Sequence, residues 1–378
     1  MISVQKEAQT QRAVMQTTAQ SAALQRAVAA GAAELNAQRA QQAAVDHLVA
    51  AKAAEQQQGV RATVQATTQD ALGERYKLIS CIEGTLFGAA YLMRDAKTNA
   101  SRVAKVFMMN RLDRRSASGS RIYDQLADEI HVMKEMKGVS GVVQLLEVIE
   151  TKECTIIVMP YYSRGDLCNH IQKYRLSEGE VRHIVSRLFV ISQAFIKKGL
   201  VHADISLENI CILEYGSKEE PTKWDFVVID LGGVTPLCES KEACVKHFKD
   251  RGIPGKFNTI APESSQNFEK AVVPWNQVEA QVWMYGSLLF SLASREHLYL
   301  KETYNKYFSR IYSGAWVEDY KAVRTSMRTD HFRACYLKIE AELFALIAST
   351  LRPTDARLKW NDLITHKWFT PPTESKGT

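Results

Sequence analysis

The segments VHADISLENI, residues 201–210, and VVIDLGG, residues 227–233, contain the most informative polar residues of the chain. Asp204 and Asn209 follow a long helical pattern and are five positions apart. Asp230 ends an apolar run and precedes Leu-Gly-Gly, which is typical of a strand that ends in a turn. Two carboxylates and an amide at strand ends can hold a hard divalent cation through oxygen ligands. We therefore expect these two segments to form one site.

A lysine upstream of these segments lies in an apolar strand pattern. Lys105 is inside the run of residues 103–107, and Glu129 lies on a predicted helix. The helix is indicated by apolar residues at spacings of three and four, namely Ile122, Leu126, Ile130 and Met133. A buried ammonium group needs a counter-charge, and Glu129 is the candidate.

The pattern around these residues changes from strands to helices along the chain. Short apolar or alternating runs predict five strands, at residues 76–81, 89–93, 102–108, 142–149 and 155–159. The clearest helical patterns cover residues 177–198, 275–293, 336–351 and 360–366. The predicted fold class is α+β, with a small five-stranded β lobe that includes one helix, followed by a larger α-helical lobe.

These motifs, in this order, resemble the protein kinase family over roughly residues 75–371. The resemblance implies a bilobal kinase-like fold, with an N-lobe at 75–160, a C-lobe at 161–371 and a tail at 372–378. An extension, residues 1–74, precedes it.

The resemblance also implies roles for the polar residues. Lys105 would grip the α- and β-phosphates of ATP, with Glu129 as its ion-pair partner. Asp204 would be the catalytic base, and Asn209 and Asp230 would be ligands of magnesium. His202-Ala203-Asp204 lies where kinases have His-Arg-Asp, and Asp230-Leu231-Gly232 is similar to Asp-Phe-Gly.

The end of the predicted domain resembles kinases as well. Ala261-Pro262-Glu263 is similar to the motif that closes the activation segment, and residues 351–369 resemble the last two kinase helices. The resemblance implies that Arg357 pairs with Glu263.

The glycine-rich loop departs from the family pattern G-x-G-x-x-G. Gly88 takes the third glycine position, but Glu83 and Thr85 fall on the first two, and Gly84 is out of register. The nucleotide is expected to lie against Gly84, Gly88 and Ala90. Glycine allows backbone amides to approach phosphates closely, so we expect weaker ATP binding. A one-residue bulge would bring Gly84 into use.

Three further departures concern the catalytic loop. Ala203 replaces the arginine that receives an activation-loop phosphate, which is either a neutral loss or a sign that loop phosphorylation is not the on-switch. Ser206 replaces a lysine, and Lys256 either reaches back toward Asp204 and Ser206 or is solvated. Gln281 takes the position of a helix aspartate and is expected to accept one hydrogen bond from the loop.

The connection between the lobes is expected to bind adenine. Met159 resembles the gatekeeper residue, and the carbonyl of Pro160 and the amide of Tyr162 are the candidates for adenine hydrogen bonds, because proline has no N–H. Asp166 either meets the ribose hydroxyls or caps a helix.

The interval between Asn209 and Asp230 is longer than the family typically needs. The excess, EYGSKEEPTKW at residues 214–224, is polar and rich in turn residues. It predicts the tip of a surface hairpin.

Composition places the chain among ordinary globular proteins. The apolar content is 46%, the charged content is 24% and the net charge is +6, which is too weak to indicate nucleic acid as a partner. No apolar run is long enough for a membrane span. The seven cysteines have no paired spacing, which favours an intracellular, cytoplasmic protein.

The extension differs from the rest, because about half of residues 1–74 are Ala or Gln. It is interpreted as a helical or disordered segment, a weak coiled coil or an organellar targeting segment. It is a candidate for partner binding or self-association.

The sequence therefore predicts an ATP- and magnesium-dependent kinase that phosphorylates Ser or Thr of protein substrates. The preference for Ser/Thr rests on Leu207-Glu208-Asn209. The alternative is a pseudokinase that serves as a nucleotide-binding or scaffolding module, which the altered glycine loop favours. A small-molecule kinase is disfavoured by Ala261-Pro262-Glu263 and Arg357.

Overall fold

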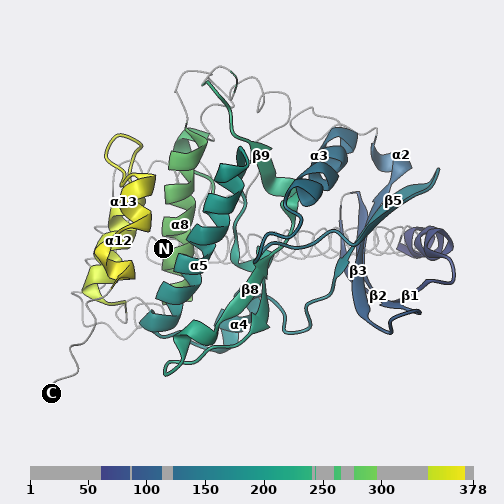
Figure 1. Cartoon of the computed structure of the whole chain (residues 1–378), viewed down its shortest axis with the longest axis horizontal. Helices are drawn as coiled ribbons and strands as arrows, with labels where there is room; N and C mark the ends of the chain where they lie inside the picture. Colours follow the sequence, from purple (N-terminus) through teal and green to yellow (C-terminus); the bar gives the residue numbers. More distant parts are fainter. Residues whose placement is uncertain are drawn as a thin grey trace, which may run out of the picture. The chain divides into compact units, whose positions relative to one another are not determined.

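The structure is a computed structural model that divides into two units, Met1–Ala66 and Thr67–Thr378. It describes residues 61–85, 87–112, 122–240, 243, 259–264, 276–295 and 339–370. Most of the predicted extension and most of the activation segment, including Lys256, therefore lie outside the described residues. The helices and strands labelled in Figure 1 belong to the second unit, which also contains the candidate site residues.

The small lobe is a five-stranded antiparallel sheet, as predicted. Its strands are β1 (Tyr76–Gly84), β2 (Gly88–Asp95), β3 (Ser101–Met108), β4 (Glu147–Glu150) and β5 (Cys154–Pro160), in the order β1-β2-β3-β5-β4. Helix α3 (Ile122–Glu135) confirms the predicted helix, and a four-residue helix α2 (Met109–Leu112), for which the sequence pattern has no signal, follows β3.

The strand predicted at residues 142–149 is shorter in the structure. Val142 makes only an isolated parallel bridge to Val228, and β4 begins at Glu147. Val142 and Val143 are buried. The apolar run therefore belongs to the core, but its first residues pack as a connecting segment instead of pairing in the sheet.

Helices and short strand pairs form the larger lobe. Its elements are α4 (Leu167–Lys173), α5 (Glu178–Lys197), β6 (Leu200–His202), η1 (Leu207–Asn209), β7 (Ile210–Glu214), η2 (Pro221–Lys223), β8 (Asp225–Val228), η3 (Leu231–Gly233), β9 (Val234–Pro236), α8 (Gln277–Ser294), α12 (Ala341–Thr350), α13 (Trp360–Ile364) and η4 (Lys367–Phe369). The α+β class and the two-lobed kinase-like arrangement are confirmed.

Local sequence explains where the two central helices begin. Ser177 forms a capping box with Glu180 at the start of α5. Asn276 caps α8 by accepting hydrogen bonds from the amides of Val278 and Glu279. Helix α8 is buried over most of its length, which agrees with its nearly continuous apolar sequence. It forms the centre of the large lobe beside α5 and α12 (Figure 1).

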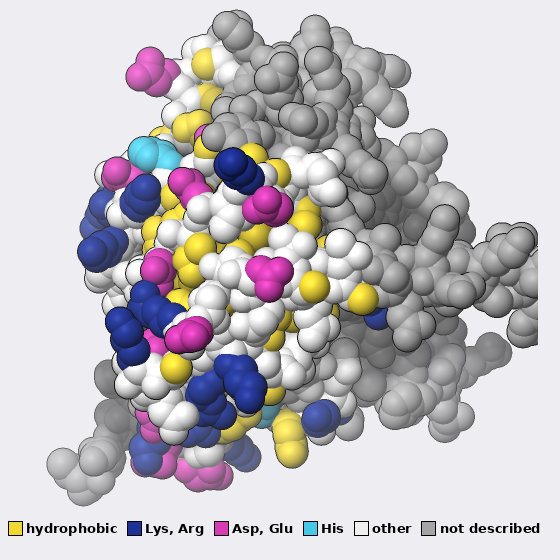
Figure 2. All heavy atoms as spheres, turned by 90° about the vertical axis from the view of Figure 1, so that its right-hand side faces the viewer, with side chains coloured by type: hydrophobic (Ala, Val, Ile, Leu, Met, Phe, Trp, Pro, Cys, Tyr) yellow, Lys and Arg dark blue, Asp and Glu magenta, His cyan; other side chains and the backbone are white. Residues whose placement is uncertain are grey.

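Strand β1 contains two β-bulges. The pairing of β1 with β2 shifts register between Leu78 and Ser80 and again between Cys81 and Glu83. The residues between these positions, Ile79 and Ile82, are about half exposed. Figure 2 views the molecule from the small-lobe end, where apolar side chains lie among acidic and basic ones.

The predicted hairpin at residues 214–224 is present between β7 and β8, but its last residue is not part of an exposed tip. Trp224 is 2% exposed, and its indole N–H donates to Glu180 of α5 over 2.9 Å. His183 of α5 contacts the carbonyl oxygen of Trp224 at 3.1 Å. The apolar surface of Trp224 outweighs the polarity of its neighbours, so this end of the hairpin is fixed to α5.

Candidate active site

A three-residue ionic network joins the two lobes. The Lys105 ammonium of β3 lies 2.7 Å from a carboxylate oxygen of Glu129 in α3 and 2.7 Å from Oδ1 of Asp230. The Glu129 side chain is buried, whereas the Asp230 side chain is 47% exposed. The predicted partner of Lys105 is therefore confirmed, and Asp230 is its second partner.

The network shifts the pKa values of its members. Burial alone would lower the pKa of Lys105, but the carboxylates of Glu129 and Asp230 outweigh it and raise that pKa. The Lys105 ammonium lowers the pKa of Asp230. Burial raises the pKa of Glu129. Lys105 is thus charged at neutral pH, and Asp230 is an ionised carboxylate suited to bind a cation.

The catalytic loop brings Asp204 and Asn209 together. The side-chain N–H₂ of Asn209 donates to the backbone oxygen of Asp204 at 3.0 Å and to its Oδ2 at 3.1 Å. The carbonyl oxygen of Asn209 accepts a bond from the amide of Ile229, the residue before Asp230. All three residues predicted from the two segments therefore lie in one site.

The turn after Asp230 requires small residues. Asp230 has a left-handed backbone conformation, with φ of 59°. A Cβ at Gly233 would lie 2.8 Å from the Cβ of Asp204, and a Cβ at Gly232 would lie 3.2 Å from Glu129 Oε2. The two glycines thus let the turn pack against the catalytic loop and α3 at the same time.

The donor set fits a magnesium-like cation. The nitrogen of the Asn209 side chain bonds to Asp204, so its oxygen is the atom that can act as a ligand. Asp230 adds a carboxylate. In the described part of the chain, no cluster of three or more His, Cys, Asp or Glu side chains could hold a metal ion. Magnesium usually takes one or two protein carboxylates and completes its shell with phosphate and water oxygens, so two protein ligands suffice.

Helix α8 holds the catalytic loop by an unexpected contact. The amide of Ile205 donates to the sulfur of Met284 over 3.3 Å. Gln281 is buried, and within the described residues neither its side-chain oxygen nor its nitrogen has a hydrogen-bond partner. The prediction that Gln281 accepts a bond from the loop is therefore wrong. The amide of Asp204 donates instead to Nδ1 of His202.

His202 is a buried scaffold residue. Burial lowers the pKa of His202 to about 4, so the ring is neutral and its Nδ1 can accept the bond from Asp204. The strand β6 that carries it pairs with β9, the first strand after the Asp230 turn.

Backbone packing shapes the connection between β1 and β2. A Cβ at Gly88 would collide with the carbonyl oxygen of Val106, so β2 can approach β3 only with glycine here. Ala90 is the cross-strand partner of Lys105. A Cβ at Gly84, by contrast, would meet nothing within 4 Å. A one-residue bulge is present in β1 between Cys81 and Glu83. That it brings Gly84 into use at the nucleotide stays a prediction.

The residues predicted to contact adenine and ribose lie at the end of β5 and in the segment that leads from β5 to α4. Pro160 ends β5, where it pairs with Arg102 of β3. Burial raises the pKa of Tyr162 to about 12. Asp166 caps α4, where its carboxylate accepts bonds from the backbone and side-chain nitrogens of Asn169, both at 2.7 Å. The capping role is thus confirmed, and a ribose contact stays a prediction.

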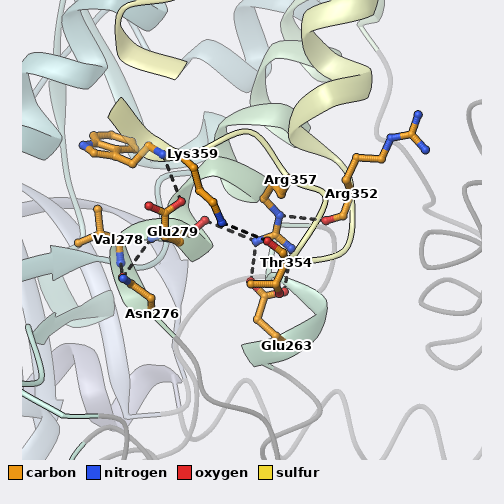
Figure 3. Close-up of polar contacts among 9 residues, drawn as sticks. Glu263, Asn276, Val278, Glu279, Arg352, Thr354, Arg357 and Lys359 are labelled. Carbon is orange, nitrogen blue, oxygen red and sulfur yellow. Dashed lines mark hydrogen bonds and ion pairs between the residues drawn. The ribbon is translucent and has the colours of Figure 1, made fainter. Parts of the chain in front are cut away.

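The predicted pair of Glu263 and Arg357 is confirmed (Figure 3). Two parallel bonds of 2.5 and 2.8 Å join the guanidinium to the carboxylate, and both side chains are 2% exposed. The Nε of Arg357 donates to the backbone oxygen of Arg352. A buried bidentate pair fixes geometry strongly, so it ties the end of the activation segment to the C-terminal helices.

Two positioning residues were not found from the sequence. Met284 carries no recognisable signal as a loop anchor. Gln277 of α8 donates to Thr235 and to the carbonyl of Pro236, both at 2.9 Å, and accepts from the amide of Cys238 at 2.7 Å. Glutamine at a helix start is common, so only the fold shows that it holds the strand that follows the Asp230 turn.

A lysine paired with a helix glutamate, beside an Asp–Asn loop and a second aspartate, defines a protein kinase-like site. The family model for the protein kinase domain matches residues 83–369, which is more than half of the chain. This chain belongs to the protein kinase family. Among the helices of the described residues, none has the length and apolar character that crossing a membrane requires.

Curated relatives share this assignment. The chain is similar to NUAK family SNF1-like kinase 1 of Mus musculus, with 34% identity over 104 residues, or 26% of this chain and 16% of that protein. It is 24% identical over 306 residues to CBL-interacting serine/threonine-protein kinase 13 of Arabidopsis thaliana, or 79% of this chain and 52% of that protein. Serine/threonine-protein kinase unc-51 of Caenorhabditis elegans is 25% identical over 189 residues, or 49% of this chain and 21% of that protein. The chain thus spans about half or less of the length of these relatives.

Proposed function

We propose that this chain is an ATP- and magnesium-dependent protein kinase that transfers the γ-phosphoryl group of ATP to Ser or Thr of protein substrates. The observation that carries the proposal is the network of Lys105, Glu129 and Asp230 beside the bonded pair of Asp204 and Asn209. Phosphoryl transfer depends mainly on positioning and charge neutralisation, and these five residues supply both.

The residues have separate roles in the proposed mechanism. Lys105, held by Glu129, would bind the α- and β-phosphates. Asp204 would accept the proton of the substrate hydroxyl. The substrate oxygen would attack the γ-phosphorus while the bond between that phosphorus and the bridging oxygen of the β-phosphate breaks. Asn209 and Asp230 would hold magnesium, which neutralises charge on the phosphates when bound. The preference for Ser or Thr is supported by Leu207-Glu208-Asn209 and by the names of the relatives.

A pseudokinase remains the second candidate, and one observation favours it. Gln281 replaces the expected aspartate without bonding the catalytic loop among the described residues. A loop held by fewer bonds would position Asp204 less tightly. The intact metal-binding pair argues for catalysis, since a scaffold has no chemical need of it.

Phosphoryl transfer from labelled ATP to a generic basic protein tests the proposal. We expect magnesium-dependent label on Ser or Thr, and a loss of at least about a hundredfold in the variants Asp230→Asn and Asp204→Asn. The matched control is Glu219→Gln, which makes the same change from acid to amide on the exposed hairpin. Wild-type protein that binds ATP but transfers no label would favour the pseudokinase.

We further propose that the kinase domain covers residues 75–371, that the chain is intracellular, and that residues 1–74 bind a partner or a second copy. The abrupt change from Ala and Gln to an aromatic-rich sequence supports the boundary, and the seven cysteines without paired spacing support an intracellular location. Light scattering on the full chain and on a chain that begins at residue 67 would test the last point. If both proteins have the mass of a monomer, self-association through residues 1–74 is ruled out.

A further inference from the structure

The turn between β1 and β2 is closed by one side chain. The hydroxyl oxygen of Thr85 accepts hydrogen bonds from the amide of Gly88 at 3.0 Å and from the amide of Phe87 at 3.3 Å. The amide of Thr85 in turn donates to the carbonyl of Gly88 at 3.1 Å. Two successive N–H groups therefore converge on a single neutral oxygen.

Converging backbone amides of this kind form an anion-binding concavity. Gly88 is close to Lys105 in the sheet, because Ala90, two residues after Gly88 in β2, is the cross-strand partner of Lys105. The proposed function places the phosphates of ATP at Lys105. A phosphate oxygen is a stronger acceptor for these amides than a hydroxyl, because it is charged. Phosphates and the Thr85 hydroxyl thus compete for the same two donors.

We propose that Thr85 is an internal competitor for the phosphate-binding amides of Phe87 and Gly88, and that it lowers the affinity of this site for nucleoside di- and triphosphates. This inference rests on the proposed function. It differs from the expectation drawn from the sequence, where a missing glycine weakens binding by crowding. Here the weakening comes from a hydrogen-bond acceptor that must leave before the phosphates bind.

The two explanations are separated by Thr85→Val and Thr85→Ser. Valine keeps the branched shape and removes the acceptor, whereas serine keeps the hydroxyl and is the matched control. Binding of ATP, ADP and adenosine to the full chain is measured by calorimetry in the presence of magnesium, without an acceptor protein. Thermal unfolding of each variant without nucleotide reports on folding.

We expect Thr85→Val to bind ATP and ADP roughly tenfold more tightly than the wild type, since one or two net hydrogen bonds no longer have to be exchanged. Adenosine has no phosphate, so its affinity should be the same in both proteins. Thr85→Ser should bind ATP like the wild type.

Two results would overturn this proposal and leave the proposed function standing. One is an affinity of Thr85→Val for ATP equal to that of the wild type. The other is an equal loss of ATP and adenosine binding in Thr85→Val, which would show that the hydroxyl stabilises the loop conformation that binds the nucleotide. A failure of all three proteins to bind any of the nucleotides would overturn the proposed function together with this inference.

Discussion

The catalytic loop and the β1–β2 turn are built in different ways. Around Asp204 and Asp230 the candidate catalytic groups are side chains, and each is bonded to another side chain of the site. In the β1–β2 turn the proposed phosphate-binding groups are backbone amides, which the Thr85 hydroxyl holds beside the close approach of Gly88 to β3. Residue type therefore determines the first region, whereas backbone geometry determines the second.

The largest expected effect is on the side-chain region. Lys105→Met leaves the buried carboxylate of Glu129 without its counter-charge, so we expect the free energy of unfolding to fall by about 3 kcal/mol. Urea denaturation measures it. The double variant Lys105→Met with Glu129→Leu removes both charges and should regain most of the stability while transfer stays lost. Equal stability of the single variant and the wild type would show that the network contributes no net stability.

A smaller effect is expected in the turn. Gly88→Ala places a Cβ against the carbonyl oxygen of Val106, so β2 and β3 must move apart, at a cost of about 1–3 kcal/mol. Gly84→Ala is the matched control, because its Cβ meets nothing within 4 Å, and it should change stability by less than about 0.5 kcal/mol. Similar losses at both positions would contradict the idea that close strand packing selects glycine.

The smallest effect is expected at Gln281 of α8. Gln281→Met removes a buried amide group that has no partner among the described residues, so stability should be unchanged or rise by about 1 kcal/mol. Gln277→Met, one turn earlier on the same helix, removes three hydrogen bonds and should destabilise the protein. Thermal unfolding compares the two. A loss of stability in Gln281→Met would mean that its amide makes a bond in solution.

Much of the site could be predicted because its chemistry needs particular residue types. A lysine in an apolar strand requires a buried acid, and Glu129 was found as the partner of Lys105 in this way. The pair of Arg357 with Glu263 followed from the resemblance to kinases, whose motifs keep both residue types. The five strands followed from alternation and turn residues.

The remainder depends on packing that no local pattern records. The sulfur of Met284 replaces a helix carboxylate as the loop anchor, and Trp224 is buried within a polar segment. Each of these contacts joins residues whose proximity is created by the fold.

The two bulges of β1 also bear on solubility. β1 is at one edge of the small-lobe sheet, and such an edge is a template on which a strand from another molecule can pair and begin aggregation. A bulge interrupts the regular row of hydrogen-bonding groups and twists the strand. The irregularities at Ile79 and Ile82 therefore oppose edge-to-edge aggregation along a strand that exposes both isoleucines.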